Sequence, residues 1–100
     1  MKTTIKEQND KMIAILEGRL DTAAANETEM AMSPLLSSEG KDIIIDCTDL
    51  AYISSSGLRI FLSILKSAKA KGEHVYIKGI SGDIRAVFTM TGFINLFEFI

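Results

Sequence analysis

The sequence contains little of what metal and redox sites are built from. It has one cysteine, Cys47, and one histidine, His74, among 100 residues. A single cysteine excludes an intramolecular disulfide and a CxxC motif, and one histidine alone is poor material for a metal site. We therefore expect no metal, no cofactor and no catalytic residue. Cys47 is interpreted as a small buried hydrophobic residue and His74 as an ordinary strand residue.

Long apolar runs and an excess of basic charge are also missing. No segment approaches the ~20 apolar residues of a membrane span, and the polar residues 1–11 lack the apolar region of a signal peptide. These features predict a cytoplasmic protein with no membrane contact. The 11 basic and 13 acidic side chains give a net charge of −2 and form no basic stripe, so we expect no nucleic-acid partner.

The length and the apolar content predict one domain over residues 1–100. Hydrophobic residues make up 47% of the chain, which is enough for one core. The predicted strands are residues 3–7, 12–16, 42–47, 74–78 and 96–100. The predicted helices begin at Asp21 or Thr22, at Ser56 or Gly57, and at Ser81, and Pro34 predicts a kink or restart in the first of them.

This order of elements predicts an α/β fold with a mixed, mainly parallel sheet of about five strands and about three helices. The short connection between the first two strands predicts an N-terminal antiparallel hairpin. The continuously apolar run from Met12 to Leu16 predicts a strand that is buried on both faces. Right-handed crossovers gather the strand-to-helix loops at one edge, so we expect Asp21 and the serines at 54–56 to be neighbours.

Four interpretations apply to the segment Ser54-Ser55-Ser56-Gly57. A serine can cap the following helix, which contributes about 1 kcal/mol. The helix start can bind an anion, although the GxxxxGK[ST] pattern is absent. A serine can act as a nucleophile, although the GxSxG motif is absent. Finally, a serine can accept a regulatory phosphate, which composition alone does not establish.

Asp46 follows the apolar run Ile43–Ile45 and has two interpretations. It can mimic the phosphoacceptor or magnesium ligand of a receiver domain, with Asp49 close by in the sequence. We favour a structural aspartate that hydrogen-bonds the following loop, because the DxD spacing of an acidic cluster is absent.

Four segments together resemble the STAS domain family, and in particular the stand-alone bacterial anti-anti-sigma factors (anti-sigma factor antagonists). The segments are Gly18–Asp21, Ile43–Asp46, Ile53–Leu58 and Asp83–Gly92. In the family the phosphorylated residue immediately precedes the glycine, which implies phosphorylation of Ser56. Ser54, Ser55 and Gly57 then form the rest of the phosphorylation loop.

The resemblance implies regulation of transcription by partner switching. The unphosphorylated protein binds an anti-sigma factor that has serine kinase activity and so frees a sigma factor; phosphorylation dissolves the complex. The resemblance also allows a serine phosphatase as a further partner. The family's aspartate on the earlier loop falls on Asp21, with Thr22 beside it. Leu58 and Arg59 in the first helical turn are additional candidates for partner contact. The alternative interpretation places Leu58 in the core and Arg59 on a solvated face.

The sequence departs from the family pattern in two places. Many members carry aspartate two residues before the phosphorylated residue, where this chain has Ser54. Members also often finish with a further helix, whereas this sequence stops at Ile100, which leaves the apolar residues 93–100 to be covered. We expect a monomer or a weak homodimer that pairs edge to edge. The alternative function is a STAS subunit that docks on a transport ATPase without phosphorylation, and a small nucleotide-binding or phosphatase-like enzyme ranks third.

Overall fold

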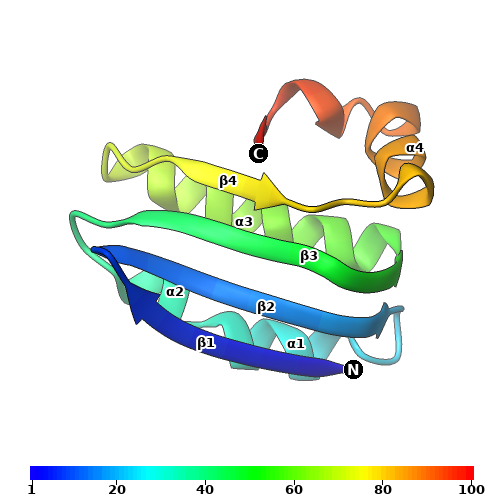
Figure 1. Cartoon of the computed structure of the whole chain (residues 1–100), viewed down its shortest axis with the longest axis horizontal. Coiled ribbons are helices and arrows are strands. Elements are labelled where there is room, and N and C mark those ends of the chain that lie inside the picture. The colour runs from blue at the N-terminus through cyan, green and yellow to red at the C-terminus, as the bar shows by residue number, and fades with distance from the viewer.

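The computed structural model describes residues 1–100 and contains one five-stranded sheet with four α-helices (Figure 1). The strands are β1 (Lys2–Gln8), β2 (Lys11–Leu20), β3 (Asp42–Ile53), β4 (Val75–Lys78) and β5 (Glu98–Phe99). The helices are α1 (Ala25–Met32), α2 (Pro34–Ser37), α3 (Ser55–Ala70) and α4 (Gly82–Met90), followed by a 3-10 turn at Phe93–Asn95. The predicted α/β fold class is confirmed.

The strands lie side by side in the order of the chain, β1-β2-β3-β4-β5. β1 and β2 form the predicted antiparallel hairpin, and all later neighbours are parallel. The two residues of the hairpin turn, Asn9 and Asp10, have φ values of 53° and 60°. These are left-handed conformations, which asparagine and aspartate adopt more readily than most residues.

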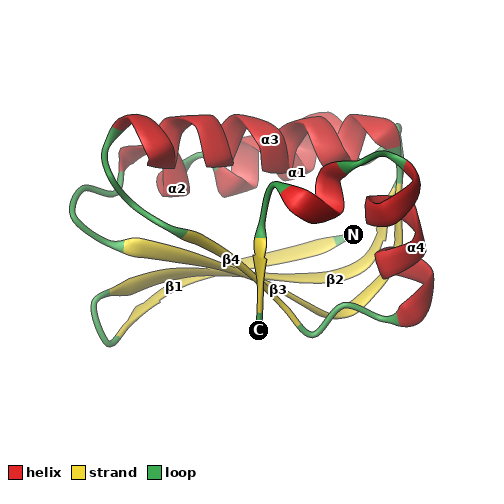
Figure 2. Ribbon diagram, turned by 90° about the horizontal axis from the view of Figure 1, so that it is seen from above, coloured by secondary structure: helices red, strands yellow, loops and turns green.

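Helices α1, α2 and α3 cover one face of the sheet, and no helix covers the opposite face (Figure 2). The prediction that residues 12–16 are buried on both faces is therefore wrong. Ala14 and Leu16 point to the helices and are fully buried, whereas Ile13 and Ile15 point to the open face and are half-exposed. The continuous apolar run hid this difference, because its period-2 alternation shows only in the folded chain.

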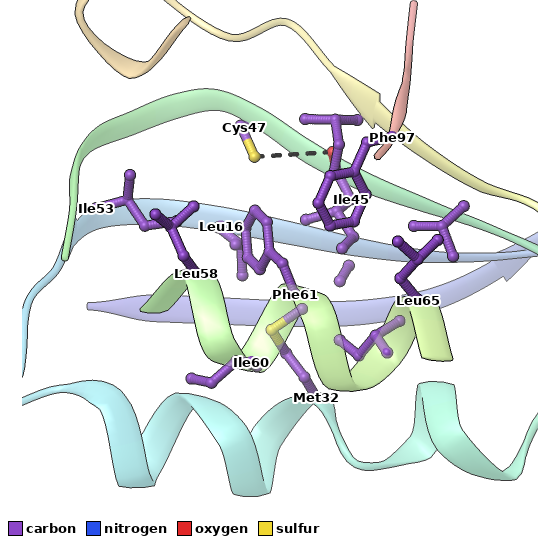
Figure 3. Close-up of a cluster of buried hydrophobic side chains, with 14 of the residues drawn as sticks. Leu16, Met32, Ile45, Cys47, Ile53, Leu58, Ile60, Phe61, Leu65 and Phe97 are labelled. Carbon is purple, nitrogen blue, oxygen red and sulfur yellow. Dashed lines mark hydrogen bonds between the residues drawn. The ribbon is translucent and has the colours of Figure 1, made fainter. Parts of the chain in front are cut away.

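The core lies between the helices and the covered face of the sheet and contains 21 buried hydrophobic residues. Leu58, Phe61 and Leu65 recur at the spacing of one helical face and point from α3 toward Leu16 and Ile45 of the sheet (Figure 3). α3 is thus the main helix of the core, as the sequence pattern predicts. Pro34 begins α2 at its first position, which confirms the predicted restart.

The chain itself covers part of the apolar C-terminal segment, while Leu96 and Ile100 remain 42% and 62% exposed. Phe97 and Phe99 pack edge-on against Phe88 of α4, with ring centroids 5.9 and 5.6 Å apart. Arg85 lies over the outer part of this cluster, 5.4 Å from the Phe99 ring. β5 is only two residues long, shorter than the predicted strand at residues 96–100, since the 3-10 turn at Phe93–Asn95 and its cap Leu96 occupy the residues just before it.

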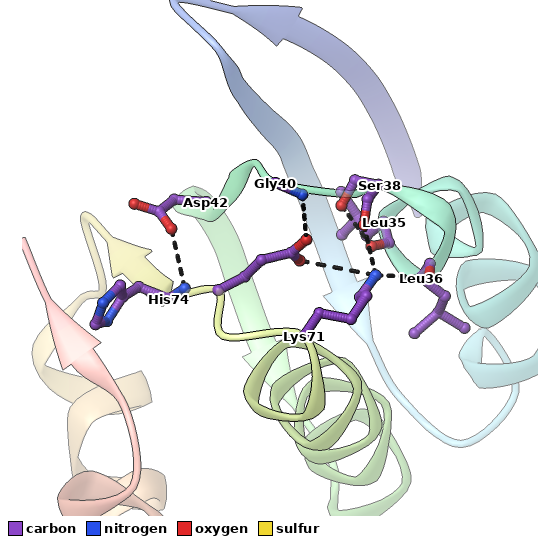
Figure 4. Close-up of polar contacts among 8 residues, drawn as sticks. Leu35, Leu36, Ser38, Gly40, Asp42, Lys71 and His74 are labelled. Carbon is purple, nitrogen blue, oxygen red and sulfur yellow. Dashed lines mark hydrogen bonds and ion pairs between the residues drawn. The ribbon is translucent and has the colours of Figure 1, made fainter.

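A buried ion pair connects the C-terminal end of α3 to the loop after α2 (Figure 4). The Glu73 side chain is 3% exposed, and its Oε2 accepts a hydrogen bond of 2.9 Å from the Gly40 backbone N–H. Lys71 Nζ lies 3.7 Å from Glu73 Oε1 and donates to the carbonyl oxygens of Leu36 and Ser38. These contacts bind the two loops at the end of the molecule that is remote from the serines.

Candidate functional site

The loops that follow β2 and β3 meet at the carboxyl ends of these two parallel strands. Leu20 and Ile53, the last residues of the strands, lie opposite each other in the sheet. The backbone N–H of Ser54 donates a hydrogen bond of 2.9 Å to the carbonyl oxygen of Leu20. This geometry brings Asp21 next to the serine segment, as predicted from the topology.

Ser54 is the cap of α3. Its side-chain oxygen accepts a hydrogen bond of 3.2 Å from the Gly57 N–H, and its backbone is extended, as the capping position requires. The prediction that the helix begins at Ser56 or Gly57 is wrong, because the helix begins at Ser55. Aspartate and serine are both good caps, so Ser54 keeps this function at the position where many family members have aspartate.

Gly57 lies where the helix passes closest to the strands. A Cβ atom built on it would be 2.7 Å from Leu20 Cγ and 2.9 Å from Ile53 Cγ1, which is too close for any side chain. The glycine therefore lets the first turn of α3 approach the ends of β2 and β3. This approach fixes the position of the residue before it, Ser56.

Ser56 is half-buried and opens on a groove of about 320 Å³ between α1 and α3. The groove is lined by Thr22, Ala25, Asn26, Glu29, Ser56, Arg59 and Ile60. Of the predicted partner-contact residues, Thr22 and Arg59 are exposed here, on opposite walls. Leu58 is 2% exposed and belongs to the core, so its side chain supports the helix and presents no surface.

Two residues of the groove, Asn26 and Glu29, were missed at the sequence level. Together with Thr22 they recur every three or four positions, which is the spacing of one helical face. This signal was present, but the rotation of α1 about its axis depends on packing against α3. A polar face of a short helix is also most often simply solvated.

The two aspartates singled out in the sequence both accept local hydrogen bonds, Asp21 within a turn and Asp46 within β3. Asp21 Oδ1 accepts a hydrogen bond of 3.0 Å from the Ala24 N–H, within a turn that precedes α1. α1 itself begins at Ala25, so the prediction of a helix starting at Asp21 or Thr22 is wrong by one turn. Asp46 Oδ1 accepts hydrogen bonds from the N–H and the hydroxyl of Thr48, at 3.0 and 2.7 Å. The preferred structural interpretation of Asp46 is confirmed.

Neither the histidine nor the cysteine of the chain lies beside the serines. His74 lies beside Asp42 at the amino end of β3, so the whole length of that strand separates it from Ser54. Cys47 is fully buried, and burial together with the charge of Asp46 raises the pKa of its thiol to about 12. The structure contains no group of three or more His, Cys, Asp or Glu side chains that could hold a metal ion. None of its helices is both long and apolar enough to cross a membrane.

The sequence matches the model of the STAS domain over residues 2–100. The chain belongs to the STAS domain family. Among its relatives, the anti-sigma-B factor antagonist of Staphylococcus aureus is 30% identical over 79 residues, which cover 79% of this chain and 73% of the relative. The resemblance found in the sequence is thus confirmed.

Solved structures share the fold of this STAS domain. An anti-sigma factor antagonist from Mycobacterium paratuberculosis aligns with a TM-score of 0.81 at 20% identity, covering 98% of this chain and 83% of that one. SpoIIAA of Bacillus aligns in its unphosphorylated form with a TM-score of 0.75 at 18% identity, covering 99% and 87%. The phosphorylated form of SpoIIAA aligns with a TM-score of 0.74 at 19% identity, covering 99% of this chain and 91% of that one.

Proposed function

We propose that this STAS domain is an anti-sigma factor antagonist whose complex is controlled by phosphorylation of Ser56. The observation that carries the proposal is the position of Ser56, half-buried in the first turn of α3 and open to the groove between α1 and α3. The name of the Staphylococcus aureus relative supports this function over docking on a transport ATPase. In the proposed cycle, the partner is an anti-sigma factor with serine kinase activity, a phosphatase restores the serine, and the domain itself catalyses nothing.

A phosphate on Ser56 would be tolerated by the domain itself. It adds a charge of about −1.5 to −2 at the N-terminus of a 16-residue helix that has no acidic residue in its first turn. The helix dipole favours a negative charge there by roughly 0.3–1 kcal/mol. Arg59 and Glu29 both line this groove, so their opposite charges offset each other beside the phosphate. We therefore expect the fold and its stability to change little on phosphorylation.

The effect of the phosphate falls on the partner instead. A partner that covers the groove contacts Thr22, Ser56 and Arg59 together, and the phosphate would be a desolvated charge in that interface. A shift from about 99% bound to 1% bound requires a difference of roughly 5.5 kcal/mol in binding free energy. A buried, unpaired charge costs about 2–5 kcal/mol or more, which is the scale that such a switch needs.

The test measures the affinity of the anti-sigma factor for three variants by calorimetry. Ser56→Ala should bind like the wild type, and Ser56→Asp should fold normally but bind much more weakly. The matched control is Ser55→Asp, which adds the same charge one residue away at an exposed position outside the groove. It should retain most of the affinity. Equal affinity of Ser56→Ala and Ser56→Asp would show that Ser56 is not the switch.

A further inference from the structure

The open face of the sheet carries a row of five neighbouring side chains, one from each strand. The strand register places Lys6 beside Ile13, Ile13 beside Ile44, Ile44 beside Tyr76, and Tyr76 beside Glu98. The three central side chains are half-buried, whereas the residue that follows each of them in the chain is fully buried against the helices. The row is therefore an apolar strip with Lys6 at one end and Glu98 at the other, where the Glu98 carboxylate also lies 3.2 Å from His74 Nδ1 of its own chain.

The order of this row is complementary to itself. A two-fold axis that runs along β3 past Ile44 places Lys6 of one copy opposite Glu98 of the other. The same axis places Ile13 opposite Tyr76 and brings the two Ile44 side chains together. Such self-complementarity is what a two-fold symmetric interface requires. We propose that the open face of the sheet is a homodimer interface, with Ile44 at its centre and two Lys6–Glu98 pairs at its edges.

The rest of the face has the same polarity. Basic residues gather on the first two strands and acidic residues on the last three, with Glu17 and Lys78 as exceptions. The basic residues are Lys2, Lys6 and Lys11, and the acidic residues are Asp42, Asp46 and Glu98. Asp42 and Asp46 lie on the central strand. Lys11 of β2 lies beside Asp42, and Lys78 of β4 lies beside Asp46. On the axis each aspartate lies opposite the same residue of the other copy, and the neighbouring lysine of its own chain offsets that charge.

The size of the face fits a weak contact. The molecule measures 31 × 26 × 20 Å, and the sheet lies across the two longer dimensions together with α4 and the C-terminal turn (Figure 1). The open face is therefore smaller than the roughly 800 Å² that each partner contributes to a standard interface. An apolar centre with a charged rim is also the usual composition of such surfaces.

The dimer goes beyond the proposed function and does not compete with it. Helices α1 and α3 lie on the other side of the sheet, so the groove between them that contains Ser56 stays accessible when two open faces stack (Figure 2). The two proposals therefore succeed or fail separately. Self-association is measured without the anti-sigma factor, and the binding of the anti-sigma factor is measured with Ser56 variants that leave the open face unchanged.

The experiment is sedimentation equilibrium of the purified chain from micromolar to millimolar concentration. The wild type should show a reversible monomer–dimer equilibrium. Lys6→Glu and Glu98→Lys should each raise the dissociation constant roughly tenfold, because each turns two attractive pairs into repulsive ones. The double variant Lys6→Glu/Glu98→Lys should restore the wild-type constant. Lys66→Glu, an exposed position on α3, is the control and should change nothing.

Two results would overturn the proposal. A wild type that stays monomeric at every concentration leaves the face to another partner or to a further segment of the chain. If neither single charge reversal weakens the dimer, or if the double variant does not restore it, the dimer interface lies elsewhere, for example at the edge of β5. Because both charged residues are exposed, circular dichroism should show the same fold for every variant.

Discussion

Gly57 lies so close to Leu20 that a single added carbon atom would come within 2.7 Å of the leucine Cγ. This contact couples the start of α3 to the end of β2, and Ser54 adds a hydrogen bond from its N–H to the Leu20 carbonyl at 2.9 Å. The serine segment is therefore positioned by packing as well as by its own hydrogen bonds. This contact therefore also helps to shape the groove between α1 and α3.

Replacing this glycine should destabilise the fold. We expect Gly57→Ala to lower the free energy of unfolding by about 1–3 kcal/mol, since the new methyl group must displace Leu20 and Ile53. Gly82→Ala is the matched control, because the added carbon would meet no other part of the molecule within 4 Å and the backbone φ is not left-handed. It should be neutral or slightly stabilising. Urea denaturation measures both, and an unchanged stability of Gly57→Ala would contradict the contact.

The cap of α3 gives a second prediction, which separates the serines. Ser54→Ala should cost about 1 kcal/mol, because the Gly57 N–H loses its acceptor. Ser55→Ala should cost far less, since the Ser55 side chain makes no hydrogen bond in the structure and is exposed. Ser54→Asp should keep the cap and gain up to about 1 kcal/mol from the helix dipole. Equal losses for Ser54→Ala and Ser55→Ala in thermal unfolding would contradict the assignment of Ser54.

The assignment of the cap shows what the sequence could not reveal. Ser54, Ser55 and Ser56 are equally good caps by residue type, so their order alone does not decide among them. The choice depends on where β3 ends, and that was predicted six residues too early, at Cys47. Thr48 and Asp49 look like a turn, but one extra residue of β3 bulges between the pairs Ile15–Asp46 and Glu17–Asp49. The strand then continues to Ile53.

Patterns with strong local causes were predicted correctly. The hairpin, the restart at Pro34 and the buried face of α3 follow from turn residues, from proline geometry and from helical spacing. The proximity of Asp21 to the serines followed from the topology of parallel strands. The half-exposed positions of Ile13 and Ile15 were not predictable, since no local pattern says how many faces of a sheet the helices cover.

The lone thiol gives a prediction about alkaline pH. The pKa of Cys47 is raised from 9.0 to about 12 by burial, with a further contribution from the charge of Asp46. Its folded pKa lies above its unfolded pKa, so the stabilisation is fully present below pH 9 and is lost as the pH rises toward 12. Relative to Cys47→Ala, the wild type should lose up to about 1.4 kcal/mol of stability per pH unit in this window.

The same burial should protect the thiol from chemical modification. A disulfide reagent such as DTNB should react with Cys47 only as fast as the chain opens, because the side chain is fully buried. Addition of urea to the midpoint of unfolding should restore the rate of a free thiol. Rapid reaction of the native protein, or parallel stability curves for the wild type and Cys47→Ala above pH 9, would contradict the buried position.

The ion pair at the far end of α3 gives a fourth prediction. Glu73→Gln keeps an oxygen that can accept from the Gly40 N–H but removes the charge opposite Lys71. Glu73→Leu removes both and leaves a partly buried ammonium, so it should cost about 3 kcal/mol or more, and Glu73→Gln clearly less. A double-mutant cycle with Lys71→Met, followed by urea unfolding, measures the coupling. Additive losses would show that the two side chains act independently.

The order of the strands has a consequence for how the chain assembles during its synthesis. Because the spatial order repeats the order of the chain, every strand from β2 onward pairs with a neighbour that the ribosome has already made. No strand has to wait for a later one or insert between two others. The serine segment completes its contacts with Leu20 as soon as α3 forms, so the groove that contains Ser56 can be in place before the last third of the polypeptide is made.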